Sequence, residues 1–291
     1  MVDHFLGILE NVSEIIVNMP LKHGYSFDIL SYHDLENILL AIEGDGWQYS
    51  CEYDHLYNYF DVKGRQDNYV IITQNQSQNG DHLDYILETF EKMRLFKPGN
   101  IRLIYYCCHD EIQEGDLDGS VASVSSTMSS EIIFTDDNSF YDIKVEEIPE
   151  LLDFLNNFTL PLKHDYLQLA YETYQKTFEI KDKNLSFLVS MIGIELLLNP
   201  SHIEITHRVS RNAAVLIGKN KDESIEIYER MKKLYGIRSK IVHGELMRVD
   251  SEVHLKEIRS YLKESIQEST KLNISKQELM FELNTYGFTN Y

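Results

Sequence analysis

A change in hydrophobic period near residue 145 constrains the fold of this chain more than any other feature. Before it, aromatic and β-branched residues gather in short runs with a period of about two, which is typical of β-strands. After it, apolar positions recur about every 3.6 residues almost to the end of the sequence, which is typical of amphipathic helices. The sequence therefore predicts an α+β fold. We expect a mixed α/β-sheet domain over residues 1–145, a connecting helix and linker over 146–162, and an all-α bundle over 163–291.

Turn residues and periodicity place the expected elements within these domains. In the first domain we expect helices over 32–43 and 81–96, a mobile loop over the Ser-rich residues 120–130, and strands over 46–53, 55–62, 69–73, 101–108, 131–135 and 139–145. In the bundle we expect helices over 163–180, 184–199, 202–218, 222–243, 251–272 and 275–285. The sequence leaves the order of the strands open.

Charge is distributed unevenly between the two halves. Residues 1–150 carry the whole net charge of −20, with 8 Lys and Arg against 28 Asp and Glu. In residues 151–291 the positive and negative charges are balanced. Affinity for a phosphate backbone comes mainly from Lys and Arg, so the first half should repel RNA. Its strong negative charge predicts a sensor, a regulator or a substrate gate, with a protein or small-ligand partner.

Several chemical classes are excluded by composition and spacing. Three cysteines form no even-numbered disulfide framework, which indicates a reducing, cytoplasmic location. No run of about 18 apolar residues predicts a membrane span, and the acidic amino terminus does not fit a signal peptide. The calcium-like segment Glu114–Gly119 has Ser125 where the loop requires glutamate, and neither Cys107–His109 nor His202 with His207 has metal-ligand spacing. We therefore expect no metal and no cofactor.

The residues that most directly predict chemistry are Arg238 and His243, at the end of the longest expected helix. An imidazole can give or take a proton near neutral pH, and a guanidinium matches phosphate oxygens with forked donors. Five positions along an ideal helix separate two side chains by about 140°, so the helix must bend or stop. Gly244 is expected to stop it in the left-handed conformation, which places His243 at the negative end of the helix dipole.

The motif and the helices before it resemble the Arg-x4-6-His motif of HEPN domains, in particular the ApeA-type branch found in bacterial anti-phage defence. The likeness covers roughly residues 160–272 and rests on the order and spacing of Leu185–Leu198, His207–Gly218 and Glu229–Glu245. It implies a metal-independent endoribonuclease that cleaves tRNA or other single-stranded RNA. In that reaction a 2′-hydroxyl attacks the adjacent phosphate, His243 moves a proton and Arg238 stabilises the phosphorane. Family dimers bring two motif helices together, so we expect a homodimer.

Other residues are predicted to support this site. The family has an acidic residue at the position of Glu195, which lies in an apolar helix and is expected to meet a cation, either Arg238 or an arginine of the next helix. Ser239 is expected to touch the phosphate and Tyr235 to shape the cleft. The residues expected to bind substrate are Lys233, Lys240, Arg208 and Arg211.

Each of these residues also has a purely structural interpretation. Arg238 and His243 can cap helix carbonyls, Glu195 can face solvent, Tyr235 can belong to the core, and Lys233 can pair with Glu229 one turn earlier. These interpretations fit an alternative function, a non-catalytic dimerisation or interaction protein whose acidic domain binds a partner.

Overall fold

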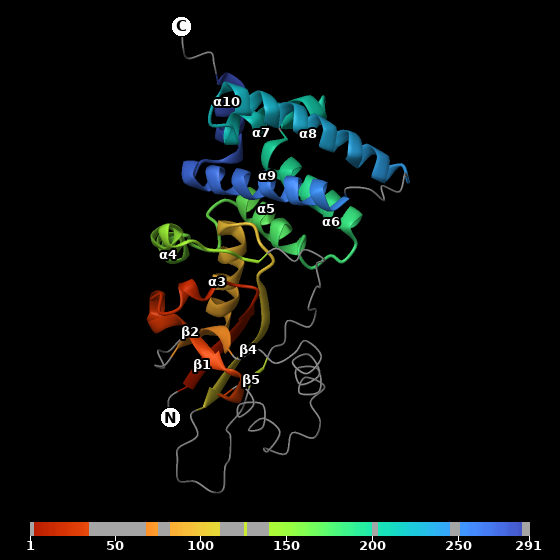
Figure 1. Cartoon of the computed structure of the whole chain (residues 1–291). Helices are drawn as coiled ribbons and strands as arrows, with labels where there is room; N and C mark the ends of the chain where they lie inside the picture. Colours follow the sequence, from red (N-terminus) through yellow and green to blue (C-terminus); the bar gives the residue numbers. More distant parts are fainter. Residues whose placement is uncertain are drawn as a thin grey trace, which may run out of the picture. The chain divides into compact units, whose positions relative to one another are not determined.

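The computed structural model describes residues 3–34, 68–74, 82–110, 125–126, 140–199, 203–244 and 251–286 (Figure 1). The chain divides into two compact units. The first contains Met1–Ile132 and Asp136–Phe158, and the second contains Ile133–Thr135 and Thr159–Tyr291. A sheet with helices in the first unit and helices alone among the described residues of the second make the chain α+β.

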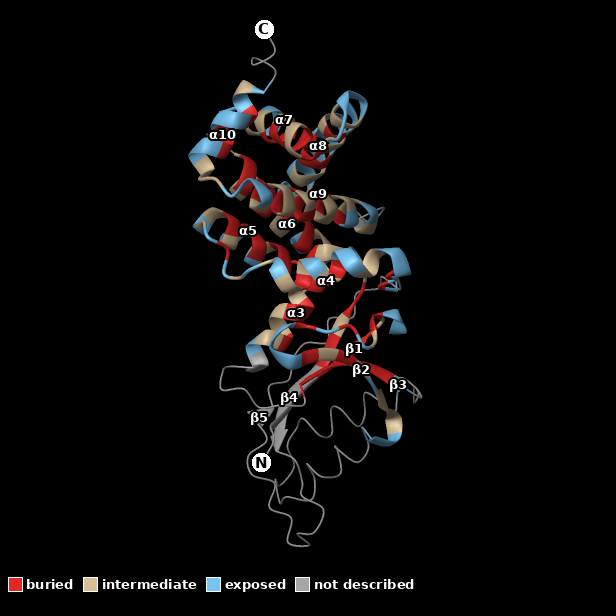
Figure 2. Ribbon diagram, turned by 90° about the vertical axis from the view of Figure 1, so that its left-hand side faces the viewer, coloured by how far each residue is buried: buried red, intermediate tan, exposed pale blue. Residues whose placement is uncertain are grey.

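An antiparallel sheet in the order β2-β3-β1-β4-β5 forms the first unit. Its strands are β1 (Asp3–Glu10), β2 (Tyr25–Ser31), β3 (Asn68–Gln74), β4 (Arg102–Asp110) and the two-residue β5 (Ser125–Ser126). The runs at 69–73 and 101–108 predict β3 and β4, whereas no run predicts β1 or β2. β3 is buried from Tyr69 to Gln74 (Figure 2).

One face of this sheet packs on the helix α3 (His82–Phe96), which the periodicity predicts over 81–96. Gly7 of β1 permits the contact, because a Cβ at this position would overlap the side chain of Ile86. Burial of Ile86, Phe90 and Met93 of α3 against the strands supplies the hydrophobic stabilisation of the unit.

The segment expected as a connecting helix and linker contains the short 3-10 helix η3 (Val145–Glu147) and α4 (Ile148–Asn157). Leu151 and Leu155 of α4 lie in the core of the first unit, and α4 packs against α3. This segment is therefore structural over most of its length, because its apolar positions need a surface to cover them.

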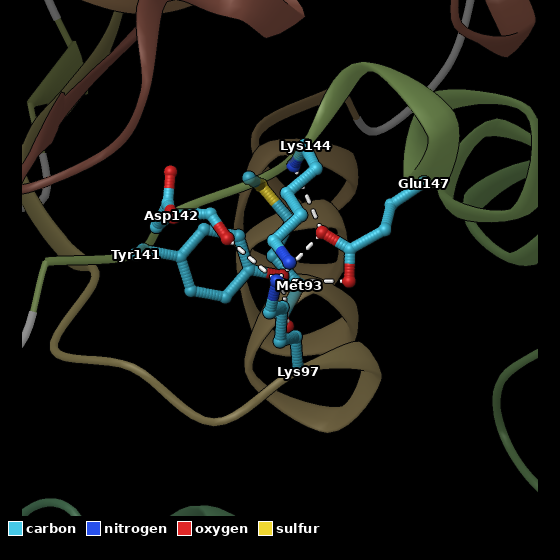
Figure 3. Close-up of polar contacts among 6 residues, drawn as sticks. All are labelled: Met93, Lys97, Tyr141, Asp142, Lys144 and Glu147. Carbon is cyan, nitrogen blue, oxygen red and sulfur yellow. Dashed lines mark hydrogen bonds and ion pairs between the residues drawn. The ribbon is translucent and has the colours of Figure 1, made fainter.

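Polar contacts link residues 141–147, around the start of this segment, to the end of α3 (Figure 3). The hydroxyl of Tyr141 donates to the carbonyl of Met93 at 2.6 Å, and Lys97 Nζ lies 2.6 Å from both the Asp142 carbonyl and Glu147 Oε2. The backbone N–H of Lys144 also donates to Glu147 at 2.8 Å. The Lys97 hydrogen bond and then the Lys144 N–H hold the pKa of Glu147 below its usual value.

Two expectations for the first unit are corrected here. The strand expected over 139–145 is wrong for residues 140–145, where Tyr141 forms an isolated bridge to Val12 and its side chain is anchored on α3 instead. Within the expected loop 120–130, Ser125 and Ser126 pair with β4. The helix expected over 32–43 is helical at its described residues, 32–34. The rest of it, and the strands expected over 46–53, 55–62 and 131–135, lie outside the described residues.

The second unit contains six helices among its described residues. They are α5 (Asp165–Lys176), α6 (Lys183–Leu198), α7 (Ile205–Ile217), α8 (Lys221–Val242), α9 (Ser251–Leu272) and α10 (Lys276–Thr285). α6 packs between α5 and α9, and α7 packs along α8. The approach of α6 to α9 is close, since a Cβ on Gly193 would overlap Leu262.

All six helices are predicted by the periodicity, with errors at their ends. Asn199 ends α6 and Gly218 ends α7 as expected. α7 begins at Ile205 rather than 202, because Glu204 before it adopts a left-handed φ of 53°. α8 begins at Lys221 rather than 222, and its cap is Asn220, whose side chain accepts from the N–H of Glu223 at 3.0 Å.

Candidate functional site

The end of α8 has the form that the sequence predicts. Helical geometry continues to Val242, and His243 is the C-cap, with its N–H donating to the carbonyl of Ser239 at 3.0 Å. Gly244 then adopts a φ of +82°, a conformation that glycine tolerates without steric cost. The helix therefore stops directly after the two motif residues rather than bending between them.

Arg238 lies on the face of α8 that turns toward the bundle. It follows the buried residues Met231 and Leu234 at helical spacing. Arg238 Nε lies 3.4 Å from Glu195 Oε1 of α6, with the side chains 38% and 20% exposed. The cation predicted for Glu195 is thus Arg238. The partly buried carboxylate attracts the guanidinium and leaves part of it open to solvent, and Glu195 Oε1 makes no hydrogen bond with it.

Tyr235 sits one turn before Arg238 and belongs to the buried face of α8, with 7% of its surface exposed. Burial raises the pKa of its hydroxyl, and the nearby negative charge of Glu195 raises it further, partly offset by Arg238. The hydroxyl therefore stays protonated and cannot serve as a base near neutral pH. Tyr235 lies beside the ion pair as a packed, neutral side chain.

His243 is exposed, and it leaves α8 in a different direction from Arg238. Because α8 is helical between them, their side chains are separated by about 140° around its axis. Ser239, directly after Arg238, is also exposed. The structure therefore brings Glu195, Tyr235 and Arg238 together and places Ser239 and His243 on another side of the same helix.

The residues expected to bind substrate fall into two groups. Lys233 and Lys240 are exposed on α8. Arg208 has Glu204 as its ion-pair partner at 4.0 Å, and Arg211 donates to the carbonyl of Leu283 at 2.7 Å. Arg211 therefore fastens α7 to α10, which gives it a structural role.

A polar cluster between α7 and α8, formed by His207, Tyr228 and Lys232, is not predicted from the sequence. His207 Nδ1 lies 2.9 Å from the hydroxyl of Tyr228, and the two rings meet edge to face at 86°. The ammonium of Lys232 lies over the Tyr228 ring, 5.1 Å from its centroid. The spacing of four residues between Tyr228 and Lys232, which places them on one helix face, is the signal that was available.

Over the described part of the chain, no group of three or more His, Cys, Asp and Glu side chains is arranged to hold a metal ion. Within the same residues, no helix is both long and apolar enough to span a bilayer. Comparison of the chain with family models, curated proteins and solved structures finds no match.

Proposed function

We propose that this protein is a metal-independent endoribonuclease of the HEPN type, with Arg238 and His243 as its catalytic residues. The observation that carries the proposal is the ion pair between Arg238 and Glu195, together with the exposed His243 at the end of the same helix. A purely structural role for Arg238 would not account for the exposed imidazole of His243 at the end of α8.

In the proposed reaction, the RNA supplies its own nucleophile. A 2′-hydroxyl attacks the adjacent phosphorus, the bond to the 5′-oxygen breaks, and the products are a 2′,3′-cyclic phosphate and a free 5′-hydroxyl. His243 transfers a proton at one of these oxygens, which typically contributes about 10²–10⁴-fold to the rate. Arg238, held by Glu195, stabilises the negative charge that builds on the phosphorane oxygens.

A second copy of the chain completes this site in the proposal. Arg238 and His243 diverge by about 140° on α8, so one copy does not aim both at a single phosphate. Two copies with their α8 ends adjacent would form two sites, each with the Arg238 of one copy and the His243 of its partner. A homodimer with RNA as its substrate follows.

The decisive experiment is cleavage of tRNA and total RNA in EDTA by four proteins whose folding is checked by circular dichroism. These proteins are the wild type, Arg238→Ala, His243→Ala and Glu195→Gln. Cyclic phosphate ends are expected from the wild type. Loss of the proton-transfer group in His243→Ala, or of charge stabilisation in Arg238→Ala, should reduce the rate by about 100-fold or more.

Glu195→Gln keeps the shape of the side chain and removes the charge that restrains Arg238, so a smaller loss is expected. If the wild type produces no cyclic phosphate from either RNA, the alternative function of an interaction protein replaces this proposal. If both alanine variants cleave as fast as the wild type, the catalytic residues lie elsewhere.

A further inference from the structure

One face of α8 carries a line of accessible residues. It leads from the polar cluster of His207, Tyr228 and Lys232 to His243. The line consists of Tyr228, Lys232, Gly236, Ser239 and His243, and we call it the α8 stripe. At 100° per residue these positions fall within an arc of about 80° and span about 22 Å along the helix. Tyr228 is half-buried and the other four are exposed.

The end of the stripe at Tyr228, opposite to His243, is a pre-organised aromatic site. The 2.9 Å contact of Tyr228 with His207 fixes the phenol ring across two helices, and the exposed imidazole stands at right angles to it. Unstacked bases bind on Tyr and His rings of this kind. Lys232, over the Tyr228 ring, adds a positive charge that a phosphate can use.

Gly236, midway along the stripe, has no explanation in the fold. A Cβ at this position would meet no heavy atom of the described residues within 4 Å, and its φ is not positive. Glycine is among the least favourable residues in a helix interior, so packing and backbone geometry give no reason for it. Its effect is to leave the helix backbone open to close approach from outside.

We propose that the α8 stripe is a track for single-stranded RNA, in which one base stacks on the Tyr228 and His207 pair and the strand runs past Lys232 and Gly236 to His243. This inference rests on the proposed function and extends it to the substrate class. It predicts a preference for a strand with an unpaired base several nucleotides from the cleaved bond. Aromatic, cationic and hydroxyl groups along the stripe favour RNA over an apolar protein partner.

The test measures binding separately from cleavage. The probe is a fluorescein-labelled oligouridine of eight nucleotides carrying 2′-O-methyl groups, which lacks the nucleophile and stays intact. Fluorescence anisotropy gives its Kd for the full-length wild type and for Tyr228→Ala, Tyr228→Phe, Lys232→Ala and Gly236→Leu. Lys271→Ala is the matched control, because Lys271 is also exposed and pairs with a glutamate three residues earlier, as Lys232 does.

Tyr228→Ala should raise the Kd by about 5- to 100-fold, as loss of one stacking platform does, while Tyr228→Phe should retain most of the affinity. Lys232→Ala should weaken binding and reduce the salt slope by about 0.7. Gly236→Leu should weaken binding by steric exclusion without loss of helix stability. Lys271→Ala should match the wild type, and a duplex of the same length should bind more weakly.

The outcomes separate this inference from the proposed function. Loss of binding in the stripe variants without any cleavage of ordinary RNA by the wild type would retain the track and reject the nuclease. Cleavage by the wild type with unchanged binding in the stripe variants would reject the track alone. The track is also wrong if the wild type binds no probe, or if Gly236→Leu changes only the mass of the assembly in sedimentation, which would mark a protein interface.

Discussion

At the scale of single residues, the contact of Lys97 with Glu147 makes the stability of the first unit depend on pH. The pKa of Glu147 is lowered from 4.5 in the folded state, so the unfolded chain binds this proton more readily. The contribution of the carboxylate is fully present above pH 4.5 and is lost as the pH falls through the lowered pKa.

We therefore expect Glu147→Gln to lower the free energy of unfolding by about 1 kcal/mol at neutral pH, since this charged hydrogen bond is partly exposed to solvent. At about pH 3 the difference between the two proteins should shrink, because the Glu147 carboxyl of the unfolded wild-type chain is then mostly protonated, which removes part of the stability that the charged form provides. Urea unfolding of both proteins at the two pH values measures it. An equal difference at both pH values would show that the charge of Glu147 contributes nothing.

Glu195 shows how far sequence reasoning reaches at this scale. A carboxylate within the apolar helix α6 predicts a cationic partner, and the structure provides one in Arg238. The sequence could not choose among Arg238, Arg208 and Arg211, because that choice depends on how α6 crosses α7 and α8. Arg211 could not be recognised as structural either, since its carbonyl partner belongs to Leu283, 72 residues away.

At the scale of one element, α8 contains Gly236 and is followed by Gly244, and these two glycines respond oppositely to the same substitution. A Cβ meets no heavy atom of the described residues within 4 Å at either Gly236 or Gly244, so packing does not distinguish them. Gly244 has a φ of +82°, where alanine is strained, and Gly236 lies in the helix interior, where alanine is favoured.

Gly244→Ala is expected to lower the free energy of unfolding by about 1 kcal/mol, and Gly236→Ala to raise it by about 0.5–1 kcal/mol. Urea unfolding followed by circular dichroism at 222 nm measures both, and each variant is the control for the other. Changes of the same sign would mean that the helix does not end between these two positions.

Helices of the second unit follow from the sequence because their signal is local. Apolar spacing and caps such as Asn199 lie within the segment that they define. Strands depend on partners elsewhere, and in β1 and β2 polar residues and Gly7 interrupt the apolar runs. The role of Gly7 appears only when α3 is placed on the sheet.

At the scale of the whole molecule, the proposed composite site predicts complementation between inactive proteins. In a mixed dimer of Arg238→Ala and His243→Ala chains, one site combines both substitutions, and the other combines the intact Arg238 of one copy with the intact His243 of its partner. With random exchange of subunits, the mixture should regain about one quarter of the wild-type sites.

RNA cleavage by each variant alone and by their equimolar mixture measures this recovery, after subunit exchange has been confirmed by native mass spectrometry. A mixture that exchanges subunits but stays as inactive as its components would show that Arg238 and His243 act from the same copy.

The order of the sheet also determines when the first unit can form during synthesis. β1 lies between β3 and β4, so its partner residues are 61 to 107 positions away, and Val12 just after it bridges to Tyr141. Contacts of such long sequence separation form slowly, because the chain between them must be closed into a loop first. A ribosome must therefore synthesise the chain as far as Asp110 before β1 can pair along its whole length with β4, and until then the apolar residues of β1 lack these partners.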